Sequence, residues 1–118
     1  MQLYAVRIWV RSWEEARNFY RDTLRLEERF SSEAAGWAEY DVGGPCVGLE
    51  RVAPDDREGS ELVGRMVGVS LRVDDIDTTY RSLTARGVKF VAPPEKQPWG
   101  GSLAHFEDPD GNILTLLG

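Results

Sequence analysis

The sequence predicts an α+β fold made of two tandem β-α-β-β-β modules. The main observation is an internal repeat: VRIWVRSWEEA at 6–16 returns in the same register as VSLRVDDIDTT at 69–79. In each copy an alternating apolar pattern changes to helical spacing directly after a residue that favours a helix start. Because a solenoid needs at least three repeats, two copies in 118 residues indicate a pseudo-symmetric pair within one domain.

The first module opens with a strand and a helix. Residues 3–10 alternate between apolar and other residues, which is typical of a strand with one buried face. Ser12 then provides a helix N-cap, and Glu15 stands where it completes a capping box. The apolar face of the strand carries Val6, Ile8 and Val10, and the helix face that packs on it carries Ala16, Phe19, Tyr20 and Leu24.

Three further strands complete this module, at 27–32, 35–42 and 46–51, with the turn Gly43-Gly44-Pro45 before the last one. The segment 52–65 shows no periodic apolar pattern and is rich in proline, glycine and charged residues. We expect it to be a linker, so that the single domain 1–118 consists of modules 1–51 and 66–118.

The second module repeats the order of the first. A strand at 66–73 precedes a helix that begins after Asp75 and ends at Gly87, whose freedom to take positive φ suits a helix stop. The remaining strands are expected at 89–92, 102–107 and 112–117. The last two are joined by Asp108-Pro109-Asp110-Gly111, in which proline fixes φ and glycine can take φ > 0.

Composition limits the classes of function. Hydrophobic residues make up 42% and charged residues 29%, and no apolar run reaches the length of a membrane span. The absence of a charged leader and apolar signal segment predicts a cytoplasmic protein, and the single cysteine, Cys46, excludes an internal disulfide. A net charge of −6 argues against nucleic acid and anionic membranes as partners and favours a cationic small molecule.

With FEDPDGNILTLL at 106–117 as its C-terminal hairpin, this organisation resembles the vicinal oxygen chelate (VOC) superfamily of glyoxalase I, extradiol dioxygenases, fosfomycin-resistance enzymes and bleomycin-resistance proteins. The resemblance covers essentially the whole chain. It implies the glyoxalase/bleomycin-resistance-like fold, in which each module curls into half of an open barrel around a cavity, commonly within a homodimer. Whether the modules pair within one chain or exchange across the dimer stays open.

The resemblance also implies where a metal would bind. Family enzymes hold a divalent ion with a histidine on the first strand of a module and a carboxylate on its last strand. Those positions correspond here to Ala5, Gly48, Gly68 and Thr115. Alanine and glycine offer no ligand atom and a lone threonine hydroxyl is a poor one. We therefore expect no metal and no cofactor, and we transfer none of the metal-dependent reactions of the family.

Strand alternation places other side chains on the expected cavity wall. Arg7 and Trp9 lie opposite the helix-facing residues of their strand, and His105 is expected to pair with Thr115 across the final hairpin. Trp99, in a loop rich in proline and glycine, is the candidate for a mobile lid. The full set of candidate ligand-binding residues is Arg7, Trp9, Cys46, Glu50, Ser70, Arg72, Trp99, His105 and Thr115.

Three functions are compatible with such a wall. The first is a metal-free protein of the bleomycin-resistance type that sequesters an aromatic or cationic small molecule in a cavity of the dimer. The second is a metal-independent lyase, isomerase or epimerase with His105 as acid or base and Arg7 steadying a carboxylate or enolate. The third is a purely structural or regulatory dimer whose cavity has collapsed. Independently of these functions, His105 can be a structural imidazole, and Arg7 and Arg72 can form surface ion pairs.

Overall fold

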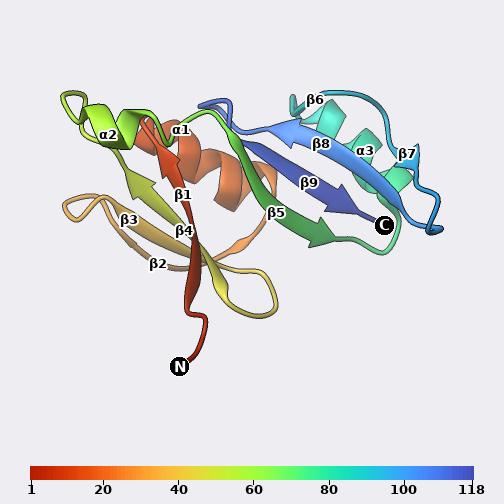
Figure 1. Ribbon diagram of the computed structural model, residues 1–118, viewed down its shortest axis with the longest axis horizontal. Helices are drawn as coiled ribbons and strands as arrows, with labels where there is room; N and C mark the ends of the chain where they lie inside the picture. Colours follow the sequence, from red (N-terminus) through yellow and green to blue (C-terminus); the bar gives the residue numbers. More distant parts are fainter.

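The computed structural model describes all of residues 1–118 and contains two sheets, one from each half of the chain (Figure 1). In each sheet the first strand of the module pairs parallel with its last strand, and the other pairings are antiparallel. The first sheet has the order β1-β4-β3-β2, formed by β1 (Ala5–Val10), β2 (Glu27–Ser32), β3 (Trp37–Asp41) and β4 (Cys46–Arg51). The second has the order β5-β9-β8-β6, with β7 also paired to β8.

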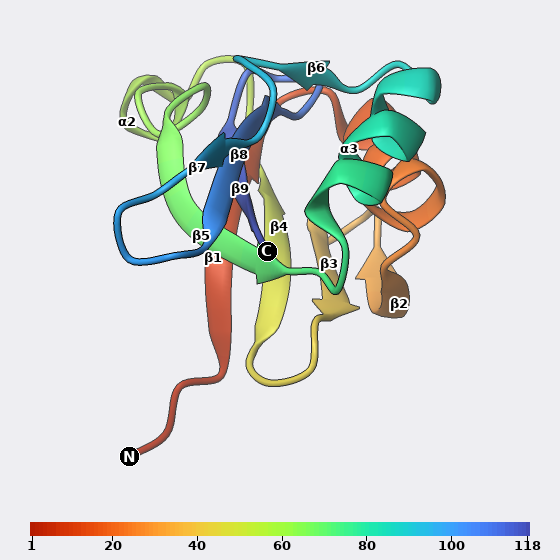
Figure 2. The same cartoon turned by 90° about the vertical axis from the view of Figure 1, so that its right-hand side faces the viewer.

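The strands of the second sheet are β5 (Met66–Arg72), β6 (Lys89–Phe90), β7 (Glu95–Lys96), β8 (Ser102–Glu107) and β9 (Ile113–Leu117). The helices are α1 (Trp13–Asn18), which continues as the π-helix η1 (Phe19–Thr23), α2 (Arg57–Ser60) and α3 (Ile76–Ala85). Figure 2 shows α1 and α3 on one side of the molecule, with β1 and β5 on the other. None of the helices combines the length and the apolar content needed to span a membrane.

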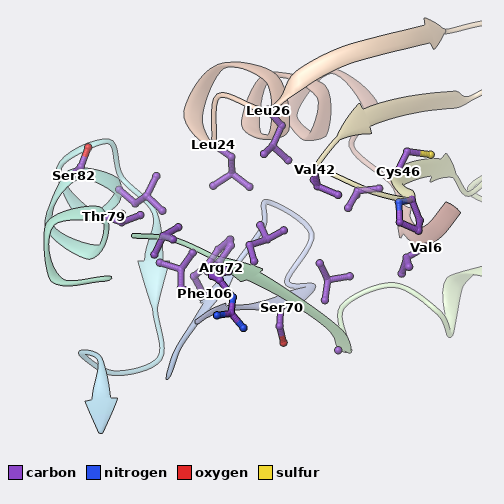
Figure 3. A pocket seen from close by; sticks show the side chains of 18 of the residues that line it. Val6, Leu24, Leu26, Val42, Cys46, Ser70, Arg72, Thr79, Ser82 and Phe106 are labelled. Carbon is purple, nitrogen blue, oxygen red and sulfur yellow. The ribbon is translucent and has the colours of Figure 1, made fainter. Parts of the chain in front are cut away.

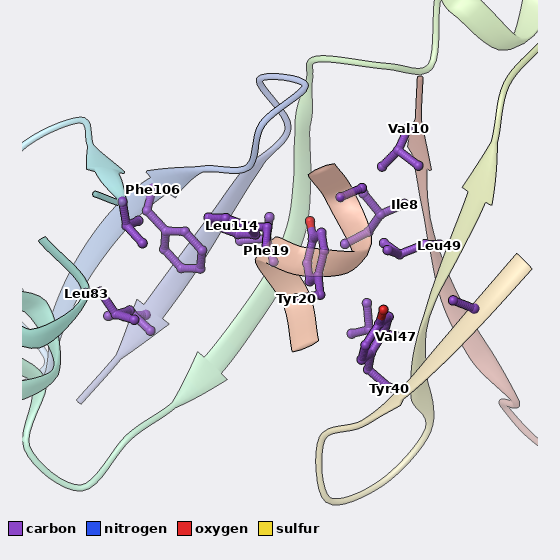
Figure 4. Close-up of a cluster of buried hydrophobic side chains, with 14 of the residues drawn as sticks. Ile8, Val10, Phe19, Tyr20, Tyr40, Val47, Leu49, Leu83, Phe106 and Leu114 are labelled. Atoms are coloured by element: carbon purple, nitrogen blue, oxygen red, sulfur yellow. The ribbon is translucent and has the colours of Figure 1, made fainter. Parts of the chain in front are cut away.

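The core lies between the two sheets and contains α1. Phe19 and Tyr20 extend from this helical segment, with Ile8 and Leu49 of the first sheet on one side and Phe106 and Leu114 of the second on the other (Figure 4). The rings of Phe19 and Phe106, one from each module, have their centroids 6.4 Å apart. Burial of one shared cluster makes the two modules a single packed unit.

The α+β prediction and most of its elements are confirmed. Strands 27–32, 46–51 and 102–107 have the predicted bounds, and Asp75 accepts the N–H of Thr78 as the N-cap of α3. Gly87 ends that helix with φ 90°, in the left-handed region. The face assignment of β1 also holds for Ile8 and Val10, which are fully buried.

Three predicted segments differ from the structure. The strand expected at 35–42 is confined to β3 because a turn occupies the residues before Trp37, where Gly36 has φ 63°. The strand expected at 89–92 has only two residues, and the following loop contains the short strand β7. The segment 52–65 includes the helix α2, which is capped by the Asp56 carboxylate through the N–H of Gly59.

The capping box predicted for Ser12 and Glu15 is wrong, because the Ser12 side chain makes no capping hydrogen bond. The carboxylate of Asp110, from the hairpin of the second module, accepts the backbone N–H groups of Arg11 and Ser12. A carboxylate near the N-terminus of a helix also interacts favourably with the helix dipole. The helix start is therefore stabilised by a residue almost one hundred positions away, which no local pattern could indicate.

The same hairpin joins the modules through a buried polar cluster. The Asn112 amide, which is fully buried, donates to the carbonyl of Trp9 and to Asp108, and its oxygen accepts the N–H of Gly64. The Tyr20 hydroxyl donates to the Asp108 carboxylate at 2.8 Å. Burial raises the pKa of Asp108, although the hydrogen bonds that it accepts act in the opposite direction. We call Asp108, Asp110 and Asn112 the hairpin clamp.

A second buried carboxylate organises the first sheet. Glu39 on β3 accepts the indole N–H of Trp37 at 2.8 Å, the Tyr4 hydroxyl at 2.7 Å and a guanidinium N–H of Arg29 at 3.1 Å. The Trp37 N–H, followed by Tyr4 and Arg29, lowers the pKa of Glu39. These donors compensate the desolvation of a side chain that would otherwise be costly to bury.

The hairpin clamp should contribute strongly to stability. We expect Asn112→Ala to lower the free energy of unfolding by about 2–4 kcal/mol, because it leaves the N–H of Gly64 and the carbonyl of Trp9 without partners. Denaturant unfolding measures this. The control Asn18→Ala, at an exposed helix position, should change it by less than about 0.5 kcal/mol. Equal effects of the two substitutions would contradict a role of the clamp in joining the modules.

The ionisation of Glu39 should make the free energy of unfolding depend on pH in the acid range. Its lowered pKa means that its contribution is fully present above the unfolded-state value of about 4.3 and is lost as the pH falls through the folded-state value. Glu39→Gln should therefore destabilise the protein by about 1–3 kcal/mol at neutral pH, and the gap to the unchanged protein should narrow in acid. Glu27→Gln, at an exposed position of the same sheet, is the control. A gap that is constant between pH 7 and pH 3 would refute this role.

Candidate ligand-binding faces

A hollow of about 820 Å³ opens between the two modules on the helix-facing side of both sheets. Figure 3 shows Leu24, Leu26 and Val42 of the first module on one side of this hollow. The opposite wall comes from β5 and α3, and it includes Val69, Leu71, Val73, Thr79, Ser82 and Leu83. We call this hollow the intermodule groove. It is predominantly apolar.

The rim of the intermodule groove is formed by two edge strands, β1 and β5. β1 and β5 stand at the ends of their sheets, so each has one edge without a neighbouring strand. Leu3 is 66% exposed and Val6 is 38% exposed, and both line the groove. Exposed edges and apolar side chains in one place mark a surface that favours association.

The other side of the first sheet, which we call its outer face, carries an arginine and tryptophan cluster. Arg7 and Trp9 of β1 both bond to Glu50 of β4, through a guanidinium N–H at 3.1 Å and the indole N–H at 3.1 Å. The guanidinium carbon of Arg7 lies 5.0 Å from the centroid of the Trp9 ring. Arg65, which immediately precedes β5, places its own guanidinium carbon 5.5 Å from that centroid.

Trp37 forms a second aromatic surface on the same face. Its ring lies against Gly48, where any added Cβ atom would collide with it, and its N–H is held by Glu39. Cys46, on the strand that contains Gly48, is fully buried, and burial raises the pKa of its thiol. A thiol in that environment is poorly suited to act as a nucleophile.

The outer face of the second sheet holds the candidate histidine. His105 pairs with Thr115, and Thr115 in turn pairs with Ser70, so that the three residues form a row across β8, β9 and β5. The Nδ1 atom of His105 lies 2.8 Å from the Thr115 hydroxyl. Trp99 is 63% exposed, and its ring packs over Gly101 in the loop before β8.

The candidate residues thus divide between the two sheets. Arg7, Trp9 and Glu50 are in contact on the first, whereas Ser70, His105 and Thr115 form the row on the second. Figure 3 places the polar ends of Ser70 and Arg72 on the side of β5 away from Leu24 and Leu26. Of the nine candidates, Cys46, Ser70 and Arg72 border the intermodule groove.

Sequence patterns did not identify several residues of the outer face. Arg65 lies in the expected linker, where no periodicity assigns a direction to its side chain, and Tyr4 lies in the predicted strand 3–10 but precedes β1 in the structure. Trp37, unlike Trp9 and Trp99, was assigned no role. Glu39 lies in the predicted strand 35–42, whose alternation does not identify its partners. The one available signal for the packing of Trp37 was Gly48. This glycine pairs with Glu39 across the sheet, and the Trp37 ring lies against it.

The residues present do not fit the metal site of the VOC enzymes. Ala5, Gly48 and Gly68 have no ligand atoms, and Trp37 fills the space against Gly48. No group of three or more histidine, cysteine, aspartate or glutamate side chains is arranged to hold a metal ion. The Glu39 carboxylate is engaged by Trp37, Tyr4 and Arg29. We therefore derive no reaction step through a metal.

Comparisons with known proteins agree with this architecture. The model of the Glyoxalase/Bleomycin resistance protein/Dioxygenase superfamily matches residues 2–116. A solved member of that superfamily from Sphaerobacter thermophilus is 33% identical, with a TM-score of 0.81 over 99% of this chain and 96% of that one. TnmS3, an antibiotic binding protein from Streptomyces sp. CB03234, is 29% identical, with a TM-score of 0.75 over 98% of this chain and 93% of that one.

A bleomycin resistance protein from Klebsiella pneumoniae is 39% identical over 54 residues, which are 40% of this chain and 43% of that protein. The family model covers nearly the whole chain, and each half of the chain forms one sheet, in agreement with the two modules of the internal repeat. The chain therefore belongs to the Glyoxalase/Bleomycin resistance protein/Dioxygenase superfamily.

Proposed function

We propose that this chain is a cytoplasmic, metal-free small-molecule-binding protein of the bleomycin-resistance type, which forms a homodimer and sequesters an aromatic ligand on the outer face of its first sheet. The observation that carries the proposal is the outer face of the first sheet. Trp37 lies against Gly48, one of the positions at which the family resemblance places a metal ligand, and its ring is fixed through Glu39. A rigid aromatic surface suits binding by stacking and burial, since little conformational entropy is lost.

The relatives support this class of function. TnmS3 is described as an antibiotic binding protein, and the Klebsiella pneumoniae relative as a bleomycin resistance protein. The outer face has the composition of small-molecule sites, namely aromatic area with a few fixed polar groups. Trp9 and Trp37 supply the area, and Arg7 and Glu50 supply the polar groups.

The homodimer is supported by the intermodule groove. Its walls are apolar, and β1 and β5 present free edges at its rim. A second copy of the chain would cover Leu3 and Val6 in both subunits by a two-fold contact, which is the commonest way to bury such a surface. The outer faces would stay open to ligand, because they lie on the opposite side of the sheets from the groove.

A metal-independent enzyme is the second candidate, and His105 is the observation that favours it. Thr115 fixes its ring through Nδ1, while Nε2 has no partner among the protein hydrogen bonds. A ring held in this way could transfer a proton from a bound molecule. His105→Gln distinguishes the candidates, because a binding protein should retain its ligand unchanged, whereas an enzyme should bind the substrate and fail to convert it.

Ligand binding should depend on the two tryptophans of the outer face. With 2-naphthamide as the probe, we expect Trp9→Leu and Trp37→Leu each to weaken binding by about 1–3 kcal/mol through lost stacking and buried area. Titration calorimetry measures this, and added EDTA should not change the result. Tyr80→Leu is the control, because Tyr80 packs on Phe90 away from this face. Failure of the unchanged protein to bind the probe at millimolar concentration would remove the proposed function.

The dimer should depend on the rim of the intermodule groove. We expect the double variant Leu3→Lys/Val6→Lys to raise the dimer dissociation constant at least about tenfold, because it places charges in an apolar contact. Light scattering and analytical ultracentrifugation measure the change. Val91→Lys is the control, since Val91 is 64% exposed and does not line the groove. A monomeric unchanged protein at micromolar concentration would refute the dimer.

A further inference from the structure

Two arginines share one tryptophan on the outer face of the first sheet. The guanidinium carbons of Arg7 and Arg65 lie 5.0 and 5.5 Å from the centroid of the Trp9 ring. Only one carboxylate accompanies them, that of Glu50, and it already accepts hydrogen bonds from Arg7 and from the Trp9 indole. Arg65 forms no ion pair with any carboxylate of the chain. The cluster of these four side chains carries one uncompensated positive charge.

Glu39, the carboxylate that binds the Trp37 indole, gives a ligand no free negative charge to pair with. Glu39 is surrounded by the Trp37 N–H, the Tyr4 hydroxyl and the Arg29 guanidinium, so its oxygens are occupied from within the sheet. The lowered pKa of Glu39 shows that these donors keep it ionised and paired. A cationic ligand would therefore meet Arg7 and Arg65 without a free acidic partner.

This local charge is opposite to that of the whole molecule, which has a net charge of −6. Arg7, Arg17, Arg21 and Arg29 form ion pairs with acidic side chains, whereas Arg65 forms none. Guanidinium groups bind planar anions through paired N–H donors and also stack on aromatic rings. Trp9 and Arg65 together present both kinds of contact.

We propose that the outer face of the first sheet selects planar aromatic molecules that carry an acidic group, with Arg65 and Arg7 holding the anion and Trp9 and Trp37 providing the aromatic contact. This inference rests on the proposed function and specifies its ligand class. It assigns a ligand-binding role to Arg65, a residue of the segment between the modules. This assignment also favours an aromatic ligand with an acidic group over the cationic ligand that the net charge of the whole chain indicated.

The test uses three probes of nearly the same shape and different charge: 2-naphthoate, 2-naphthamide and 2-naphthamidine. We expect the naphthoate to bind at least about tenfold more tightly than the amidine, and its affinity to fall as salt is raised. Arg65→Gln should weaken naphthoate binding about tenfold, the effect of one charge-assisted hydrogen bond, and should leave naphthamide binding within about twofold. Arg57→Gln, at an exposed position of α2 without an ion pair, is the matched control.

The outcomes separate the two proposals. Equal affinities for all three probes, or no effect of Arg65→Gln on naphthoate binding, would overturn the ligand class and leave aromatic binding in place. Tightest binding of the amidine would overturn it in favour of a cationic ligand. No binding of any probe to the folded protein would overturn the proposed function itself. An equal loss in Arg65→Gln and Arg57→Gln would show a general charge effect and would also overturn the role of Arg65.

Discussion

The position of Arg65 beside Trp9 on the outer face of the first sheet depends on the buried amide of Asn112. This one side chain accepts the N–H of Gly64 and donates to the carbonyl of Trp9, so it holds the end of β1 beside the segment that leads into β5. The carbonyl of Arg65 accepts the N–H of Ile113, which fixes the next residue along. The contact between Arg65 and the Trp9 ring is therefore a consequence of the hairpin of the second module.

This dependence explains how much of the molecule the sequence could predict. Alternation and capping are local, and they identified β2, β4, β8 and the start of α3. The start of α1 was predicted in the right place with the wrong partner, because Asp110 replaces the Ser12 side chain from the far end of the chain. Local pattern therefore predicts where an element begins and not always what stabilises it.

The candidate site was predictable to the same extent. Strand alternation correctly put Arg7 and Trp9 on the side away from the core and aligned His105 with Thr115. It could not identify Arg65, whose direction follows from the tertiary contact of the clamp, nor the alignment of Trp37, which follows from its bond to Glu39. The two sides of each sheet consequently differ in kind: the helix-facing side is apolar and open at the groove, and the outer side is polar and aromatic.

The packing of Trp37 on Gly48 has a consequence for substitutions at position 48. A glutamate there would require the Trp37 ring to move, since its Cβ would collide with an indole that Glu39 holds in place. Loss of Trp37 first would leave the Glu39 oxygen without the indole donor and expose a gap in the sheet. A metal ligand at position 48 requires both the replacement of Gly48 and the loss of Trp37. Each of these two changes is thus disfavoured until the other has occurred. Position 48 can therefore accept a larger side chain only together with a change at Trp37, and the two residues form one coupled unit of the sheet.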